Sequence, residues 1–179
     1  MNSDHNPRDA EYFRIEGPVS QRMIEFKSFK FPVDAAGAIG LPADPGTVRR
    51  DGSGQAMILH VAPGCFLAPE PMPDIVRLLD ALQSVDVGVR FQVDGKWQAF
   101  TLTGWGAARV LSSAINLSQV LANRDCTSIY LYDCPAVLAV RSDSFDVWVE
   151  ASYAWAFHER ASHLAQSLAA APGISFLRA

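Results

Sequence analysis

The chain has 179 residues, of which 49% are hydrophobic and 19% charged, and its formal net charge is −4. This length supports one domain with a substantial core, so we predict a mobile N-terminal tail over residues 1–20 and a single domain over 21–179. The acidic balance disfavours nucleic acid, whose phosphates select basic surfaces. No stretch approaches the ~20 apolar residues that cross a bilayer, and the polar start does not resemble a secretory signal, so we expect no membrane association and a cytoplasmic location.

In chain order, the first expected strand covers residues 22–31, where apolar and polar residues alternate. The segment 32–54 is rich in Gly, Pro, Ala and Asp, and predicts a long irregular connection. Two strands are expected at 55–61 and 65–68, followed by a helix that opens at Pro73 and carries one apolar face.

The clearest local signal is a hairpin. Residues 87–93 and 97–102 both alternate in polarity, and Asp94–Gly95 separates them. An Asp-Gly pair between alternating segments predicts a type I′ turn, in which both central residues need positive φ. A helix over about 106–114 is expected next, with Thr103 as its cap.

Three further strands are expected at 126–131, 136–140 and 145–149, and a final helix from Ser152 to about residue 170. Strands joined by short turns and interleaved with helices indicate antiparallel or mixed sheets covered by helices. The predicted fold class is therefore α+β.

Motifs for catalysis and metal binding are missing from the sequence. It has no GxSxG elbow, no HExxH and no phosphate-loop frame around its short glycine pairs. Its three cysteines form no CxxC motif and their odd number suits a reducing compartment. We therefore predict no catalytic residue and no metal site in this chain.

The last helix carries three aromatic residues, Tyr153, Trp155 and Phe157. At helical spacing they fall on different sides of the helix, so they cannot all enter one core. We therefore predict that these residues form part of a contact surface for a partner protein.

Several strings from about residue 39 onward resemble the gamma subunit of heterotetrameric sarcosine oxidase. They are Ile39–Pro42 (IGLP), Ile58–Pro69 (ILHVAPGCFLAP), Val85–Ile115, Cys126–Thr127 and Phe145–Trp155 (FDVWVEASYAW). Together with the order of elements, they span roughly three quarters of the chain.

This resemblance implies a fold like the folate-binding domain of the glycine-cleavage T-protein. It also implies a non-catalytic accessory subunit of a flavin-dependent, N-demethylating oxidase. Flavin, NAD and tetrahydrofolate are then expected on larger partner subunits, the alpha and beta chains, and no cofactor on this chain. The alternative is a stand-alone folate-binding or one-carbon (aminomethyl) transfer protein, which would need an acidic residue on the pterin, with Asp86 and Asp94 as candidates.

Overall fold

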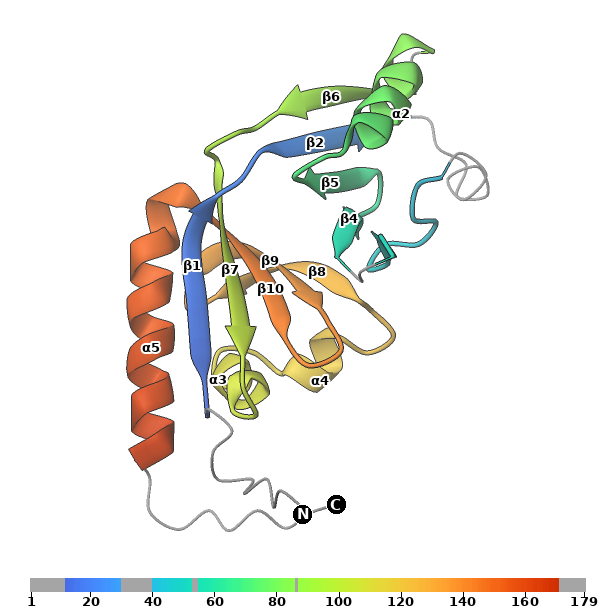
Figure 1. Ribbon diagram of the computed structural model, residues 1–179. Coiled ribbons are helices and arrows are strands. Elements are labelled where there is room, and N and C mark those ends of the chain that lie inside the picture. Colours follow the sequence, from blue (N-terminus) through green and yellow to red (C-terminus); the bar gives the residue numbers. More distant parts are fainter. Residues whose placement is uncertain (1–11, 30–39, 53–54, 86, 171–179) are drawn as a thin grey trace, which may run out of the picture.

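The computed structural model describes residues 12–29, 40–52, 55–85 and 87–170. Figure 1 shows two sheets, one above the other, with α5 alongside one of them and α2 on the other. Every strand pair described is antiparallel. The α+β prediction is confirmed.

The lower sheet in Figure 1, here the C-terminal sheet, has five strands in the order β1-β7-β10-β9-β8. Their bounds are β1 Arg14–Ser20, β7 Trp97–Thr103, β10 Phe145–Glu150, β9 Cys134–Val140 and β8 Cys126–Leu131. Alternate residues of these strands form one apolar core with the short helices α3 (Ala107–Ser112) and α4 (Leu117–Val120) and the long α5 (Ala154–Ala170). α5 contributes Ala154 and Phe157 to this core. Its buried face continues through Ala161 and Ala165, at spacings of three and four residues, and its other side faces solvent.

The upper sheet, here the N-terminal sheet, has the order β3-β4-β5-β2-β6. Its strands are β3 Val48–Arg50, β4 Ala56–Ala62, β5 Cys65–Pro69, β2 Met23–Ser28 and β6 Gly88–Gln92. Helix α2 (Pro73–Ser84) covers one face by burying Ile75, Leu79 and Leu82. Pro73 at the first helical position starts α2 where the sequence predicts it.

A third apolar core lies between the two sheets. It joins Met23, Leu59 and Leu67 of the N-terminal sheet to Trp97 and Trp148 of the C-terminal sheet. All of these side chains are at most 8% exposed. This core fixes the two sheets against each other.

The predicted hairpin is wrong. β6 pairs with β2 and β7 pairs with β1 and β10, so the two strands belong to different sheets. The link between them still turns at Asp94–Gly95, where Lys96 N–H donates to Val93 C=O at 3.1 Å. Of the two central residues, Gly95 has positive φ and Asp94 does not, which excludes type I′.

Two other expectations need correction. The tail prediction is wrong for Arg14–Ser20, because this segment is β1 and pairs with β7 on both sides of a register shift between Glu16 and Val19; residues 1–11 lie outside the described part. The connection predicted over 32–54 contains β3, which extends the N-terminal sheet beside β4. Both segments gain their strand structure from a partner distant in sequence, which local pattern does not reveal.

The helix expected at 106–114 is shorter and its cap is different. α3 ends at Ser112, and Gly106 rather than Thr103 stands at its N-cap position. A Cβ at Gly106 would lie 2.4 Å from the ring of Tyr12, so only glycine allows this ring to pack here. The final α-helix begins at Ala154, after a short 3-10 turn that contains Ser152.

Candidate functional site

The three aromatic residues predicted as interface candidates have different environments. Trp155 is 74% exposed and Tyr153 is 41% exposed, whereas Phe157 is fully buried. The Phe157 ring packs 5.0 Å from that of Phe100 and 6.1 Å from that of Tyr132, measured between centroids. Phe157 is therefore a core residue, and its prediction as an interface residue is wrong.

Tyr153 and Trp155 lie at one end of the C-terminal sheet, where β10 leads into α5. Ala151 N–H donates to Lys96 C=O at 2.8 Å, which ties this junction to the start of β7. We call Tyr153 and Trp155 the aromatic end; exposed large aromatic side chains are typical of a protein contact surface.

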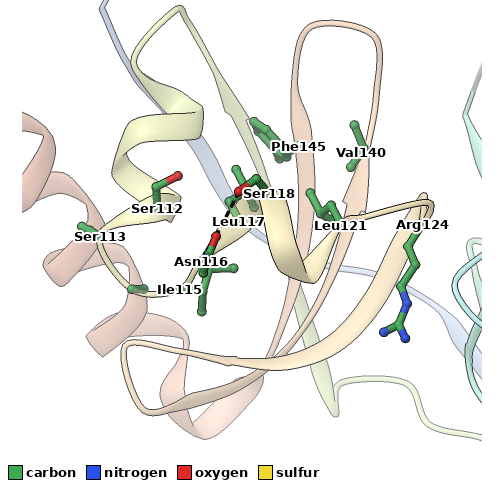
Figure 2. Close-up of a pocket in the computed structure, with 11 residues that line it drawn as sticks. Ser112, Ser113, Ile115, Asn116, Leu117, Ser118, Leu121, Arg124, Val140 and Phe145 are labelled. Atoms are coloured by element: carbon green, nitrogen blue, oxygen red, sulfur yellow. Dashed lines mark hydrogen bonds between the residues drawn. The ribbon is translucent and has the colours of Figure 1, made fainter.

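A pocket of about 990 Å³ opens beside α3 and α4 (Figure 2). Ile115, Leu117, Leu121, Val140 and Phe145 supply its apolar lining. Its polar lining consists of Ser112, Ser113, Asn116, Ser118 and Arg124. The sequence analysis missed this pocket because its walls come from separate segments without a shared motif.

The polar groups of this pocket are mostly occupied by local structure. The Asn116 side-chain oxygen accepts from Gln119 N–H at 3.3 Å and from Ser118 Oγ at 3.0 Å, which caps α4. Ser113 Oγ donates to Val110 C=O at 2.6 Å. Arg124 is the charged residue among the described residues of the lining, which include no carboxylate and no histidine. The pocket offers surface for binding but no acid–base pair.

A partly buried ion pair lies at the other end of β10, on the side that faces the N-terminal sheet. Asp146 is 4% exposed, and its carboxylate accepts from Arg141 Nε at 2.6 Å and from Thr101 Oγ1 at 3.3 Å. The adjoining cavity, which Gln21 and Trp148 also line, measures about 50 Å³. This volume suits a water molecule or two rather than a substrate. The pair joins neighbouring strands of one sheet.

The folate candidates gain no support from their positions. Asp86 lies outside the described residues. The carboxylate of Asp94 accepts from the Gln92 side chain at 2.6 Å and from Met23 N–H at 2.9 Å. These two hydrogen bonds lower the pKa of Asp94, and they hold the link between β6 and β7 against β2. Asp94 lines neither the 990 Å³ pocket nor the 50 Å³ cavity.

The titratable groups in the interior are structural. His60 is 5% exposed and its ring stacks on Phe66 at 4.2 Å, with Nδ1 3.1 Å from Pro42 C=O. Burial lowers the pKa of His60 and raises the pKa of the Cys126 thiol to about 12, so neither group is charged at neutral pH. Within the described ranges no three His, Cys, Asp or Glu side chains gather as a metal site would require.

Comparison with known proteins identifies the fold. No protein-family model matches the chain, and no curated protein matches its sequence. The structure is similar to a chain of heterotetrameric sarcosine oxidase from Corynebacterium sp. U-96, solved in complex with pyrrole 2-carboxylate. The TM-score is 0.72 at 22% identity, over 90% of this chain and 87% of that chain.

The regulatory subunit of aspartate kinase from Thermus thermophilus is a more distant match. Its TM-score is 0.47 at 14% identity, over 87% of this chain and 97% of that chain.

In the described part of the chain, no helix is both long enough and apolar enough to cross a bilayer. The resemblance predicted from the sequence is confirmed at the level of the fold, and this chain has the fold of a chain of heterotetrameric sarcosine oxidase.

Proposed function

We propose that this chain is a non-catalytic accessory subunit of a heteromeric, flavin-dependent oxidase of the sarcosine oxidase type. The observation that carries the proposal is the fold similarity, which extends over nine tenths of this chain and most of the other chain. A likeness over nearly the whole of both chains supports a subunit of corresponding size and shape. It is less typical of a small module shared by unrelated proteins.

The chemistry of the described residues is consistent with this role. The buried carboxylate of Asp146 is already neutralised by Arg141, and the Cys126 thiol stays protonated. A catalytic site needs an acid, base or nucleophile that a substrate can reach. We propose that flavin, NAD and tetrahydrofolate bind to the larger alpha- and beta-like subunits, in the cytoplasm.

The aromatic end is the contact surface that this role requires. Subunit interfaces are enriched in tryptophan and tyrosine, and a few such residues supply most of the binding free energy. With 74% of its surface exposed, the Trp155 side chain has a large apolar area to bury against a partner. We propose that Tyr153 and Trp155 enter the interface with the flavoprotein.

Co-purification from the native organism tests the proposal, with an affinity tag on this chain expressed at its natural level. The expected product is a stoichiometric complex that carries the visible absorbance of oxidised flavin and consumes oxygen when sarcosine is added. Trp155→Ala should weaken assembly of the complex by about tenfold or more. Gln166→Ala is the matched control, since it changes an exposed residue farther along the same helix.

A chain that co-purifies with no flavoprotein would overturn the proposal. If the flavin complex forms and Trp155→Ala assembles as well as the wild type, the subunit role stands and the aromatic end is not the contact surface. Calorimetric titration of the isolated chain with tetrahydrofolate then decides the alternative of a stand-alone folate-binding protein.

A further inference from the structure

The pocket beside α3 and α4 has a size and an apolar lining that suit a small molecule (Figure 2). Its volume of about 990 Å³ lies at the upper end of the range of about 300–1,000 Å³ that is typical of small-molecule sites. Four of its apolar side chains are only partly buried by the chain itself, namely Ile115, Leu121, Val140 and Phe145. A ligand that covers them removes apolar surface from water, which favours binding.

The polar side chains at one end of the pocket are engaged within the chain. Asn116 Oδ1 accepts from Ser118 Oγ and from a backbone N–H of α4, and Ser113 Oγ donates to Val110 C=O. A bound peptide would bring an N–H and a C=O with nearly every residue, and each such group needs a partner when it is buried. An alkyl or aryl group has no such need, so this lining suits an apolar body better than a peptide segment.

Arg124 brings a positive charge to the opposite end of the pocket. Figure 2 shows Ser112 and Ser113 at one end and Arg124 at the other, with apolar side chains between them. Among the described residues, no carboxylate forms an ion pair with the Arg124 guanidinium group. A guanidinium group without a carboxylate partner attracts an anion, and its fork of N–H donors matches the two oxygens of a carboxylate.

The stem of the Arg124 side chain is placed by Gly46. Gly46 has a φ of 95°, and a Cβ added there would lie 2.7 Å from Arg124 Cγ, so the glycine allows this close approach. Gly46 C=O accepts from Asp125 N–H at 2.7 Å and from Cys126 N–H at 2.9 Å. These two hydrogen bonds tie the Gly46 loop to the residues that follow Arg124. The fold therefore fixes the base of this side chain at the rim of the pocket.

The charge of the lining also selects the class of anion. A carboxylate carries one negative charge, which one guanidinium group balances, whereas a phosphate monoester carries nearly two. The described lining has no cation besides Arg124. Arg124 is exposed, so a head group bound there stays in contact with water, and the apolar body supplies most of the affinity.

We propose that this pocket binds a small amphiphilic carboxylate. Its apolar body would lie against Leu121, Val140 and Phe145, and its carboxylate would lie at Arg124. This site is separate from the aromatic end, and the inference does not depend on the proposed function. A ligand bound only by the folded chain stabilises that chain by mass action.

Titration of the isotope-labelled full-length chain tests the proposal, with sodium hexanoate as the probe and hexanol as its uncharged counterpart. Two-dimensional NMR spectra identify the amides that shift, and saturation of the shifts gives the dissociation constant. Arg124→Gln removes the charge and keeps part of the stem. Arg77→Gln is the matched control, because Arg77 is an exposed residue of α2 on the other sheet. Ser118→Trp adds a large ring to the pocket from an exposed position.

We expect saturable shifts of amides along α4 and at the start of β10. Hexanoate should bind about two- to fivefold more tightly than hexanol, as expected for an exposed ion pair. Arg124→Gln should remove this preference without changing the binding of hexanol, whereas Arg77→Gln should preserve it. Ser118→Trp should weaken the binding of both ligands about tenfold or more. Thermal unfolding without ligand establishes that each variant is folded, and the comparison of hexanoate with hexanol decides the matter without Ser118→Trp.

The absence of saturable shifts, shifts that lie away from the pocket, or a preference for hexanoate that survives Arg124→Gln would overturn the inference. Loss of the partner in co-purification of Arg124→Gln, together with unchanged binding of hexanoate, would also overturn it. The pocket would then receive an acidic segment of that partner. Because the titrations use the isolated chain, failure of the flavoprotein proposal leaves their outcome unchanged.

Discussion

Trp155 and Phe157 lie two positions apart on α5, and this spacing places them on nearly opposite sides of the helix. Phe157 fills the core beneath the helix, whereas Trp155 contacts solvent over most of its surface. Phe157→Ala should lower the free energy of unfolding by about 3–5 kcal/mol, because it leaves a cavity among aromatic neighbours. Trp155→Ala should change it by less than about 0.5 kcal/mol, because no packed core is lost.

Urea unfolding of the isolated variants measures both changes. Equal losses for the two substitutions would mean that Trp155 packs within the chain, and it would then be unavailable to a partner.

His60 should make the stability of the protein depend on pH. Its Nε2 is buried without a hydrogen-bond partner among the described residues, and burial lowers its pKa. The unfolded chain, with an ordinary histidine pKa of about 6.5, therefore binds this proton more readily than the folded chain does. The neutral form of His60 therefore stabilises the folded state. This stabilisation is complete above about pH 6.5 and is lost progressively as pH falls towards the lower pKa of His60 in the folded chain.

We expect the free energy of unfolding to decrease between pH 7.5 and pH 5.5. Urea titrations at the two pH values measure this decrease. His60→Gln should show a smaller decrease, because the substituted side chain does not titrate; an equal decrease would assign the effect to other groups.

At the scale of elements, the turn between β8 and β9 has a conformation that its residues disfavour. Tyr132 and Asp133 have φ values of 52° and 65°, and they link strands paired up to Leu131 and Cys134. Two consecutive positive φ values make this a type I′ turn, which favours asparagine followed by glycine. Tertiary contacts hold Tyr132 in this conformation: its ring packs against the core of the C-terminal sheet, and its hydroxyl group donates to Val110 C=O at 2.6 Å.

Asp133→Gly should therefore stabilise the protein by about 0.5–1 kcal/mol, because glycine adopts positive φ without strain. Asp133→Val should destabilise it by about 1–2 kcal/mol, because a β-branched residue is strained in this region. Thermal unfolding monitored by circular dichroism measures both. Destabilisation by Asp133→Gly together with stabilisation by Asp133→Val would show that the turn is relaxed with its natural residues.

The failed hairpin prediction also belongs to this scale. Alternating polarity in 87–93 and 97–102 correctly indicates two strands, and in β7 it places Phe100 and Leu102 in a core. The Asp94 carboxylate bonds to Met23 N–H of β2, which turns the chain from one sheet into the other. Because Met23 precedes Asp94 by 71 positions, the local sequence around Asp94 does not reveal this hydrogen bond.

At the scale of the whole molecule, the core between the sheets should make them unfold together. Met23 is fully buried in it, and Trp97 and Trp148 from the other sheet belong to the same core. We expect tryptophan fluorescence and far-ultraviolet circular dichroism to give coincident unfolding transitions, as in a single cooperative domain. Met23→Ala should shift both transitions equally, by about 2–5 kcal/mol.

Two separate transitions would contradict this prediction and divide residues 21–179 into two independently folding units. Glu25→Gln is the control for the same strand, because the Glu25 carboxylate forms only partly exposed ion pairs with Lys27 and Lys96.

The sequence alone determined the α+β class and most of the elements. The strands expected at 126–131, 136–140 and 145–149 all lie within β8, β9 and β10, and the helix expected at Pro73 begins there. These features depend on the period of the apolar residues and on local helix-start chemistry, which a single segment contains. The resemblance to sarcosine oxidase also rests on local strings, and the fold comparison confirms it.

Tertiary structure alone decided which strands share a sheet, which aromatic residue of α5 enters the core, and which edge stays open. Apolar periodicity places β6 and β7 in strands but does not choose their partners. Phe157 is buried and Trp155 exposed because the sheet lies against one side of α5. β8 is the last strand of its sheet because, among the described residues, no strand pairs with its outer side. Each of these outcomes depends on contacts between segments far apart in the chain, and local sequence does not specify such contacts.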